Sequence, residues 1–354
     1  MPDSLLACDL DFILEQARDD LRELAGCRLF VTGGTGFVGS WMVESLLHAN
    51  HRLNLGSRVV LLTRSPDCYR QSHPHLAFDP AVELMQGDVR TFDGPMGNVD
   101  AVIHAATPAS AKLNSESPAC MLEIVLDGMR NVLRMAANAG RVPFLFTSSG
   151  AVYGRQPPEL SHVDETYLGG PDSLSPASAY HEGKRVAELM GAIAASQGQV
   201  DVKVARLFAF IGPYLPIDAH FAIGNFIRDA LQGGPIVVRG DGTAVRSYLY
   251  GADMAIWLWG ILVRGLPGRA YNVGSEDAID IVTAAANVAI QCNPRAEVII
   301  GGVQDPGAAV DRYVPSTARG RAELGLLQQV GMAESIKRTL AWHRRVLQRV
   351  DVSC

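Results

Sequence analysis

The stretch Thr-Gly-Gly-Thr-Gly-Phe-Val-Gly at residues 32–39 is the strongest indication of fold class in the sequence. It follows the apolar run 27–31, which is typical of a buried strand, and it precedes residues 41–47, whose apolar spacing is helical. Of its regularly spaced glycines, the first permits a tight turn, the second lets the backbone approach a pyrophosphate, and the third lets helix and strand pack closely. Backbone N–H groups at the start of the helix then bind the phosphates. This context predicts a dinucleotide site made by Gly33, Thr35, Gly36, Phe37, Val38 and Gly39.

The composition is ordinary for a globular protein: 354 residues, 48% hydrophobic and 19% charged. That length accommodates one extended α/β domain with a smaller lobe. The net charge of -6 argues against nucleic-acid or membrane-surface binding, and no apolar run is long enough to span a bilayer. The N-terminus lacks the basic start of a secretory signal, and the six cysteines show neither CxxC pairs nor zinc spacing. We therefore expect a cytoplasmic protein with no metal site and no membrane or nucleic-acid partner.

Strands and helices are expected to alternate after the glycine stretch. Short apolar runs predict strands at residues 58–65, 82–89, 101–104, 143–147 and 202–208. Helical spacing is found at residues 9–25, 120–139 and 333–349. Strands that alternate with helices form parallel βαβ units. The prediction is an α/β fold: a doubly wound parallel Rossmann sheet with a smaller C-terminal α/β substrate lobe, and ligands at the carboxyl ends of the strands.

The end of the second predicted strand bears on the choice between NAD and NADP. An acidic residue at this point binds the ribose of NAD, but the chain has Thr63 followed by Arg64. A guanidinium pairs well with a 2′-phosphate, so NADP is slightly favoured. The alternative is that Arg64 is a solvated surface residue. The other expected cofactor contacts are Asp88, as acceptor of the adenine amino group, with Val89 beside it, and the small residues Ala105, Ala106 and Thr107.

Two side chains in the second half of the chain have the spacing of a catalytic pair. Tyr180 and Lys184 are four residues apart, so a helix places them on one face. An ammonium beside a phenol favours the phenolate, and we expect it to lower the pKa of Tyr180. Such a phenol exchanges protons near neutral pH. A hydroxyl from the end of the 143–147 strand would orient the same substrate oxygen. His104, at another strand end, is better interpreted as a buried, hydrogen-bonded histidine.

Three motifs, taken together, resemble the extended short-chain dehydrogenase/reductase family: TGGTGFVG at 32–39, TSSGAVYG at 147–154 and Tyr-x-x-x-Lys at 180–184. The chain is most similar to the nucleotide-sugar epimerase/dehydratase branch, and the resemblance extends over nearly the whole chain from residue 27. It implies an enzyme that uses NAD or NADP on a nucleotide-diphosphate sugar. By this resemblance Tyr180 is the acid/base, Lys184 holds the nicotinamide ribose and Ser149 holds the substrate hydroxyl.

The chain departs from the family pattern at the catalytic centre. Members that expel water across C5 and C6 of the sugar place an Asp-Glu pair directly after the hydroxyl residue, and decarboxylases usually keep the Glu. Here these positions are Gly150 and Ala151, which transfer no protons. This form is similar to the 4-epimerases and 4-ketoreductases. Val125 and Ala209 replace two further asparagines of the family, so helix packing and one substrate contact are expected to differ.

The resemblance also implies a division of the chain. Residues 1–26 form a helical extension, residues 27–208 bind the dinucleotide and carry the catalytic residues, and residues 209–354 mainly bind the nucleotide sugar, with 243–275 returning to the Rossmann domain. The expected substrate contacts are Ser149, Gly150, Asn225, Val238, Arg239, Arg246 and Arg312. For Arg239 a solvent-facing position is an equal alternative. The segment 157–176 is expected to be a mobile cover, and helices at 117–138 and 178–197 are expected to pair in a homodimer.

These features favour an NADPH-dependent 4-ketoreductase of nucleotide sugars. The alternative is a 4-epimerase that retains its NAD, and a dehydratase comes third. A dinucleotide sensor without catalysis is the interpretation from another class. The presence of Ser149, Tyr180 and Lys184 together argues against a sensor.

Overall fold

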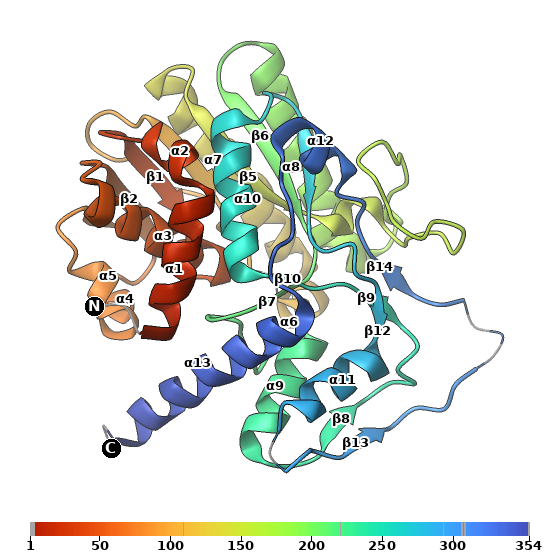
Figure 1. Ribbon diagram of the computed structural model, residues 1–354. Helices are drawn as coiled ribbons and strands as arrows, with labels where there is room; N and C mark the ends of the chain where they lie inside the picture. Colours follow the sequence, from red (N-terminus) through yellow and green to blue (C-terminus); the bar gives the residue numbers. More distant parts are fainter. Residues whose placement is uncertain are drawn as a thin grey trace.

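The computed structural model describes residues 4–352 except 109, 220, 293, 306 and 308. A seven-stranded parallel sheet with the strand order β11–β6–β5–β4–β1–β2–β3 forms its centre (Figure 1). Its strands are β1 (Arg28–Thr32), β2 (Arg58–Thr63), β3 (Val82–Gln86), β4 (Ala101–His104), β5 (Pro143–Ser149), β6 (Asp201–Leu207) and β11 (Ala270–Val273). The strand order reverses between β1 and β4, as in the predicted doubly wound sheet, and ligands bind beside such a reversal.

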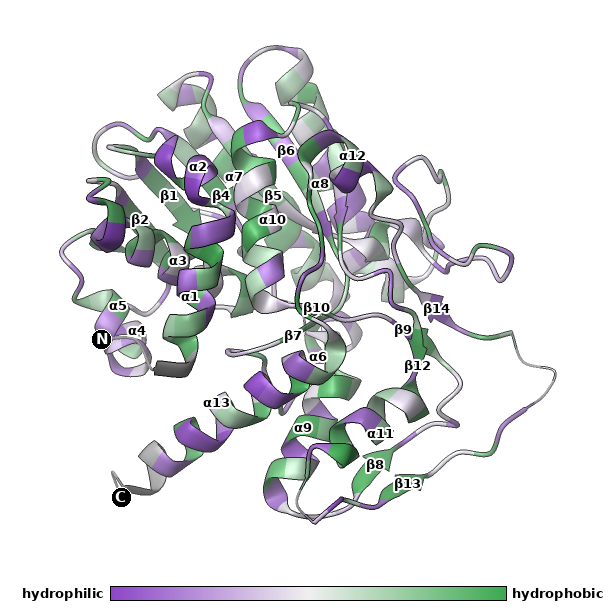
Figure 2. Ribbon diagram, viewed as in Figure 1, coloured by the Kyte–Doolittle hydropathy of each residue, from purple (hydrophilic) through white to green (hydrophobic). Residues whose placement is uncertain are grey.

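Two helical layers cover the sheet. Successive strand residues point to opposite faces, so Leu29 and Val31 pack into one hydrophobic core and Phe30 packs into the other. The first layer contains α1 (Ser4–Gln16), α2 (Arg18–Arg22), α3 (Phe37–Leu53) and α10 (Gly251–Arg264), and the second contains α7 (Pro118–Ala139) and α8 (Ala179–Ser196). Hydrophobic residues colour the central strands and most of α10 in Figure 2. This burial on both faces is typical of a parallel sheet.

Shorter elements connect the layers around the edge of the sheet. They are α4 (Pro66–Ser72), α5 (Pro74–Ala77), α6 (Ala111–Glu116), α12 (Ala318–Leu324), the 3-10 turns η1 (Gly150–Tyr153) and η2 (Pro176–Ser178), and the paired short strands β7 (Phe210–Ile211) and β10 (Leu249–Tyr250). Of these, α6 comes after β4, η1 comes directly after β5, and η2 directly precedes α8. All three contribute residues to the candidate site.

The smaller lobe is built mainly from residues after β6 and lies below the sheet in Figure 1. Its elements are α9 (Ala222–Gln232), β8 (Ile236–Val238), β9 (Val245–Arg246), β12 (Ile279–Asp280), α11 (Ile281–Ile290), β13 (Val298–Ile300), β14 (Arg312–Tyr313) and α13 (Met332–Val352). Strands β8 and β13 pair with each other, and β9 lies between β12 and β14. Strands β9 and β14 run parallel, and their register pairs Arg246 with Tyr313.

The N-terminal segment is part of the main core. The predicted helix at 9–25 is divided at Ala17 into α1 and α2. Leu10 and Ile13 of α1 are fully buried in the first core. Asp9 accepts hydrogen bonds of 2.6 Å from the Tyr250 hydroxyl and of 2.6 Å from Arg338 of α13. These contacts join the start of the chain to α10 and α13.

Among the helices in the described part of the chain, none combines the length and apolar character needed to cross a membrane.

Candidate active site

A cavity of about 1930 Å³ lies at the carboxyl edge of the sheet, between the sheet and the smaller lobe. All the residues predicted from the sequence as catalytic or cofactor-binding line this cavity. They are Gly33, Thr35, Gly36, Phe37, Val38, Gly39, Thr63, Arg64, Asp88, Val89, Ala105, Ala106, Thr107, Ser149, Tyr180 and Lys184. Six of the seven predicted substrate contacts line it as well: Ser149, Asn225, Val238, Arg239, Arg246 and Arg312. One continuous space is therefore bordered by both sets of residues.

The glycine turn has the close contacts that only glycine permits. Gly33 has a φ of +71°, and a Cβ there would lie 2.4 Å from the backbone of Ala105. A Cβ on Gly39 would lie 2.3 Å from the carbonyl oxygen of Gly33. A Cβ on Gly36 would meet only that same oxygen, at 3.5 Å, so the turn is open beside Gly36. This cradle at the N-terminus of α3 fits a pyrophosphate.

The two polar residues expected at the adenosine end differ in their surroundings. Arg64 is exposed and lies just beyond the end of β2. The Asp88 carboxylate accepts two hydrogen bonds from the Arg90 guanidinium, at 2.9 and 3.0 Å. These hydrogen bonds lower the pKa of Asp88, so the group stays ionised at neutral pH. An adenine amino group would share this carboxylate with Arg90.

Lys184 is buried in the second core with its ammonium at the cavity. Its Nζ donates hydrogen bonds to the Thr147 carbonyl oxygen at 2.7 Å and to Thr107 Oγ1 at 3.0 Å. It lies 5.9 Å from the ring centre of Tyr180. Burial lowers the pKa of Lys184 to about 7, although the charge of Glu188 opposes this change. These two bonds use two of the three N–H groups of the ammonium. The third could donate to a ribose hydroxyl.

The Tyr180 phenol lies beside Ser149, but the expected effect of lysine on it is wrong for this structure. Burial raises the pKa of Tyr180, and only a hydrogen bond with Ser149 lowers it. The physical reason is that the Tyr180 side chain is desolvated, which disfavours the phenolate. The phenol is therefore in its protonated form at neutral pH.

His104 is a structural residue, as its position in a buried strand indicates. Its Nδ1 is 2.8 Å from Thr32 Oγ1, and Phe146 stacks on the ring at 5.6 Å. Burial lowers the pKa of His104 to about 3. The ring is neutral at neutral pH and does not line the cavity.

Gly150 is the predicted substrate contact that the cavity does not reach. It is buried beneath Phe208, and a Cβ at this position would lie 2.6–2.8 Å from three atoms of the phenyl ring. Phe208 in turn packs on Tyr313, with ring centres 4.6 Å apart. The expectation that Gly150 binds substrate is corrected for this reason: an aromatic side chain covers it. Its neighbour Ala151 does line the cavity.

Tyr313 is a polar residue of the site that the sequence did not single out. Its hydroxyl is 3.5 Å from Ser149 Oγ and 3.3 Å from the carbonyl oxygen of Leu207. It comes from β14, 164 residues after Ser149. Only its neighbour Arg312 was expected in the site, and no local pattern marks the tyrosine itself.

The lobe also brings several arginines to the cavity. Arg246 pairs with Asp311 at 2.6 Å and also donates to the Asp311 carbonyl oxygen, which fixes the direction of the guanidinium. The Asn225 side-chain oxygen accepts from Arg228 at 2.9 Å, which leaves the Asn225 amide N–H groups for a ligand. Val238 is buried in β8, whereas Arg239 is exposed at the rim. This arrangement suits a diphosphate.

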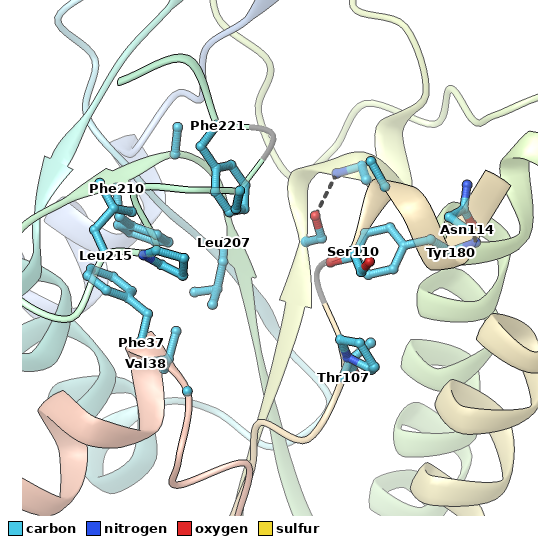
Figure 3. Close-up of a pocket in the computed structure, with 18 of the residues that line it drawn as sticks. Phe37, Val38, Thr107, Ser110, Asn114, Tyr180, Leu207, Phe210, Leu215 and Phe221 are labelled. Carbon is cyan, nitrogen blue, oxygen red and sulfur yellow. Dashed lines mark hydrogen bonds between the residues drawn. The ribbon is translucent and has the colours of Figure 1, made fainter. Parts of the chain in front are cut away.

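An apolar wall faces Tyr180 across the cavity. Figure 3 shows Phe37, Phe210, Leu215 and Phe221 on one side and Tyr180 on the other. Phe37 and Phe210 stack with ring centres 6.0 Å apart, which joins the first turn of α3 to the lobe. Of this wall, only Phe37 was expected in the site. Phe210, Leu215 and Phe221 come after the end of β6, where no motif marks them as residues of the site.

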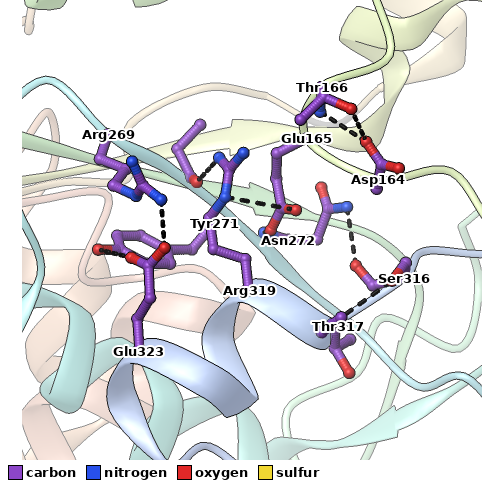
Figure 4. Close-up of polar contacts among 12 residues, drawn as sticks. Asp164, Glu165, Thr166, Arg269, Tyr271, Asn272, Ser316, Thr317, Arg319 and Glu323 are labelled. Carbon is purple, nitrogen blue, oxygen red and sulfur yellow. Dashed lines mark hydrogen bonds and ion pairs between the residues drawn. The ribbon is translucent and has the colours of Figure 1, made fainter.

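The segment 157–176, expected to be mobile, is tied to the body of the protein. Val163 exchanges backbone hydrogen bonds with residues 314–316. Figure 4 shows the Glu165 carboxylate beside Asn272 and Arg319, and the Asn272 backbone N–H donates to it at 2.8 Å. Arg185 of α8 donates to the Gly169 carbonyl oxygen at 2.9 Å. These bonds hold the segment on β11 and α8, so the expectation of a free cover is not supported.

Comparison with known proteins gives three related findings. The model of the NAD dependent epimerase/dehydratase family matches residues 29–274. UDP-glucuronic acid decarboxylase 5 of Arabidopsis thaliana is 31% identical over 309 residues, which cover 87% of this chain and 87% of that protein. The structure of the epimerase Mth375 from Methanothermobacter thermautotrophicus has a TM-score of 0.80 and 25% identity, covering 96% of this chain and 98% of that one.

A fourth similarity is to a structure with bound ligands. A double mutant of DesIV, a dTDP-glucose 4,6-dehydratase from Streptomyces venezuelae, was solved with NAD and DAU bound. It has a TM-score of 0.75 and 25% identity, covering 90% of this chain and 97% of that one.

Proposed function

Because the chain belongs to the NAD-dependent epimerase/dehydratase family, we propose that it reduces the C4 ketone of a nucleotide-diphosphate sugar, with Tyr180 as the proton donor. One observation carries this proposal. Ser149, Tyr180 and Lys184 meet at the cavity, while Gly150 and Ala151 provide no acid or base beside them. Phe208 occupies the space into which a longer side chain at residue 150 would extend. The site is therefore equipped for chemistry at one carbon and its oxygen, and not for loss of water or carbon dioxide.

The catalytic residues have separate tasks in this proposal. A nicotinamide cofactor, when held in this cavity, would supply the hydride. The Tyr180 hydroxyl donates its proton to the sugar O4, and Ser149 hydrogen-bonds to the same oxygen and orients it. Lys184 uses its remaining N–H on the nicotinamide ribose while Thr107 and Thr147 hold the ammonium in place. The raised pKa of Tyr180 keeps the proton on the phenol until the developing alkoxide accepts it.

The proposed substrate contacts extend away from this centre. Arg246, aimed by Asp311, binds the diphosphate, together with Arg312 and the Asn225 amide. Val238 and Arg239 lie by the nucleotide base. These cations and Tyr180 line one cavity, which supports a substrate that carries both a diphosphate and the reacting hexose.

The cofactor proposal goes further than the NAD dependence of the family. We favour NADP slightly, because Arg64 lines the cavity after β2 and no acid stands at Thr63 to repel a 2′-phosphate. The expected cradle of Gly33, Gly36 and Gly39 serves either dinucleotide.

The rival activities depend on the same residues. A 4-epimerase with retained NAD would need the keto sugar to turn over within the cavity before the hydride returns. A dehydratase would need a proton donor near Gly150. Several relatives are named as decarboxylases, but Ala151 disfavours that activity here. A dinucleotide sensor would not need Tyr180. The trio of Ser149, Tyr180 and Lys184 favours an enzyme over a sensor.

We also propose the division of the chain at residues 26 and 208, with 243–275 returning to the Rossmann domain. The pairing of β11 with β6 supports the return. A homodimer through α7 and α8 is supported by three exposed apolar residues along α8, Val186, Leu189 and Ile193. A cytoplasmic location is part of the same proposal.

Purified protein decides between these activities. The protein is incubated with NADPH or NADH and a nucleoside-diphosphate 4-keto-6-deoxyhexose, and dinucleotide oxidation is followed by absorbance. Net oxidation of the dinucleotide, with reduction of the ketone to an alcohol, is the expected result. Interconversion of two nucleotide hexoses without net oxidation, with NAD retained by the protein, would support the epimerase and refute the reductase.

A further inference from the structure

We infer that Asn114, a residue of α6, positions the catalytic tyrosine by capping the helix that carries it. The Asn114 side-chain oxygen accepts a hydrogen bond of 3.0 Å from the backbone N–H of Tyr180. Its amide nitrogen donates at 2.7 Å to the carbonyl oxygen of Ala177 in η2. One side chain thus joins the end of η2 to the first turn of α8, and Figure 3 shows it directly beside Tyr180.

The first turn of α8 needs such a partner. Backbone N–H groups at a helix start have no acceptor within the helix, and a preceding side chain usually supplies one. Here Ser178 occupies the cap position, but its side chain makes no capping hydrogen bond. Asn114 supplies the acceptor from a different part of the chain, 66 residues before Tyr180.

The segment that carries Asn114 also holds the other catalytic residue. Thr107, at the start of this segment, accepts a hydrogen bond from the Lys184 ammonium at 3.0 Å. Ser110 caps α6 itself by accepting from the Leu113 N–H at 3.1 Å. Residues 107–114, with residue 109 outside the described part, therefore contact the catalytic helix at Lys184 and at Tyr180.

The helices behind the catalytic pair make a different kind of contact. Val125 of α7 is buried, and a Cβ on Gly183 of α8 would lie 3.3 Å from the Val125 Cβ. At Val125 the packing of the two helices is close and apolar, and it offers no hydrogen bond that fixes α8 along its axis. Asn114 makes that bond at the end of α8 nearest the reacting phenol.

The consequence is catalytic, because the phenol must sit close to the substrate oxygen and to Ser149. Displacement of a catalytic group by about 1 Å costs up to about 100-fold in rate. Loss of the Asn114 oxygen releases the Tyr180 backbone, so the proton-donating atom samples a wider range of positions. Binding of the diphosphate depends on the distant lobe and should not change. This inference rests on the proposed role of Tyr180.

The test compares Asn114→Ala, which loses both hydrogen bonds, with Asn114→Asp, which keeps an oxygen for the Tyr180 N–H but loses the N–H that donates to the Ala177 carbonyl oxygen. Ser115→Ala is the matched control, because Ser115 is exposed on the same helix and its hydroxyl donates to the Lys112 carbonyl oxygen within that helix. Amide hydrogen exchange is measured for peptides that cover α8. Turnover, KM and the midpoint of thermal unfolding are measured on the same preparations.

We expect Asn114→Ala to speed exchange in the first turn of α8 by about fivefold, as loss of one hydrogen bond implies. We expect kcat to fall by about tenfold, with KM within about twofold of the wild-type value. Asn114→Asp should keep the slow exchange and recover most of kcat, and Ser115→Ala should behave as wild type.

Unchanged exchange and turnover in Asn114→Ala would overturn the inference. A loss of turnover that merely follows a fall in thermal stability and in exchange protection throughout the protein would overturn it as well. Equal losses in the Ala and Asp variants would also contradict it. If wild-type protein turned over no nucleotide sugar while the exchange results were as expected, the proposed function would fail and the capping contact would stand.

Discussion

Replacement of Gly150 by alanine tests the aromatic cover of the catalytic centre. The added methyl carbon would lie 2.6–2.8 Å from the ring of Phe208, closer than carbon atoms approach without displacement. The ring has little freedom to move, because Phe208 is 8% exposed and packs on Tyr313 with ring centres 4.6 Å apart. Overpacking of this kind costs about 1–3 kcal/mol. We therefore expect a loss of about 2 kcal/mol in the free energy of unfolding.

The assay is urea denaturation of wild type and variants, with the free energy of unfolding taken from the midpoint and the slope. Gly234→Ala is the matched control, since a Cβ there meets nothing within 4 Å. Alanine restricts the unfolded chain more than glycine does. This control should therefore leave the free energy of unfolding unchanged or raise it by up to about 1 kcal/mol.

A double-mutant cycle makes the test specific. In a Phe208→Ala background the methyl group at residue 150 has room, so Gly150→Ala should cost almost nothing there. Gly150→Ala that is as stable as Gly234→Ala, or a methyl group that costs the same with and without Phe208, would refute the proposed packing.

Three further predictions concern charge. His104 is neutral in the folded protein down to about pH 3, whereas its ordinary pKa is 6.5. The unfolded chain therefore binds the extra proton, and the free energy of unfolding falls as pH drops from 6.5 towards 3; His104→Asn should flatten this fall, and parallel curves would contradict it. Arg246→Gln should weaken binding of a nucleoside diphosphate by about 10- to 100-fold in calorimetry, because charged hydrogen bonds are lost. Arg295→Gln, an exposed change outside the cavity, should not. Arg64→Ala should raise the Kd for NADPH by about tenfold and leave that for NADH unchanged, and equal effects on both would remove the argument for NADP.

The parts of the site that depend on local sequence could be predicted. Gly33 and Gly39 lie where their turn requires them, because the requirement arises between a strand and the helix that directly follows it. Tyr180 and Lys184 share one side of α8, as their spacing predicts, with the ammonium 5.9 Å from the ring centre. The parallel sheet followed from the alternation of strands and helices. Six of its seven strands were predicted to within a few residues, whereas β11 was not expected as a strand.

The parts that depend on distant contacts were not predicted. Tyr313 reaches Ser149 from β14, and Asn114 reaches Tyr180 from α6, and no spacing rule connects such pairs. The position of Phe208 over Gly150 could not be foreseen for the same reason. The pKa of Tyr180 was predicted in the wrong direction because its burial depends on the whole fold, and the sequence shows only that a lysine is near.

Tyr180→Phe tests whether the Tyr180 phenol protonates the sugar oxygen. NADPH oxidation by this variant is compared with that of wild-type protein on the same nucleoside-diphosphate 4-keto sugar, and NADPH affinity is measured separately. Removal of the proton donor should reduce turnover by about 100- to 10,000-fold, while NADPH binds as tightly as before. Turnover at the wild-type rate would contradict the account, since the phenol would then not be the group that protonates the sugar oxygen.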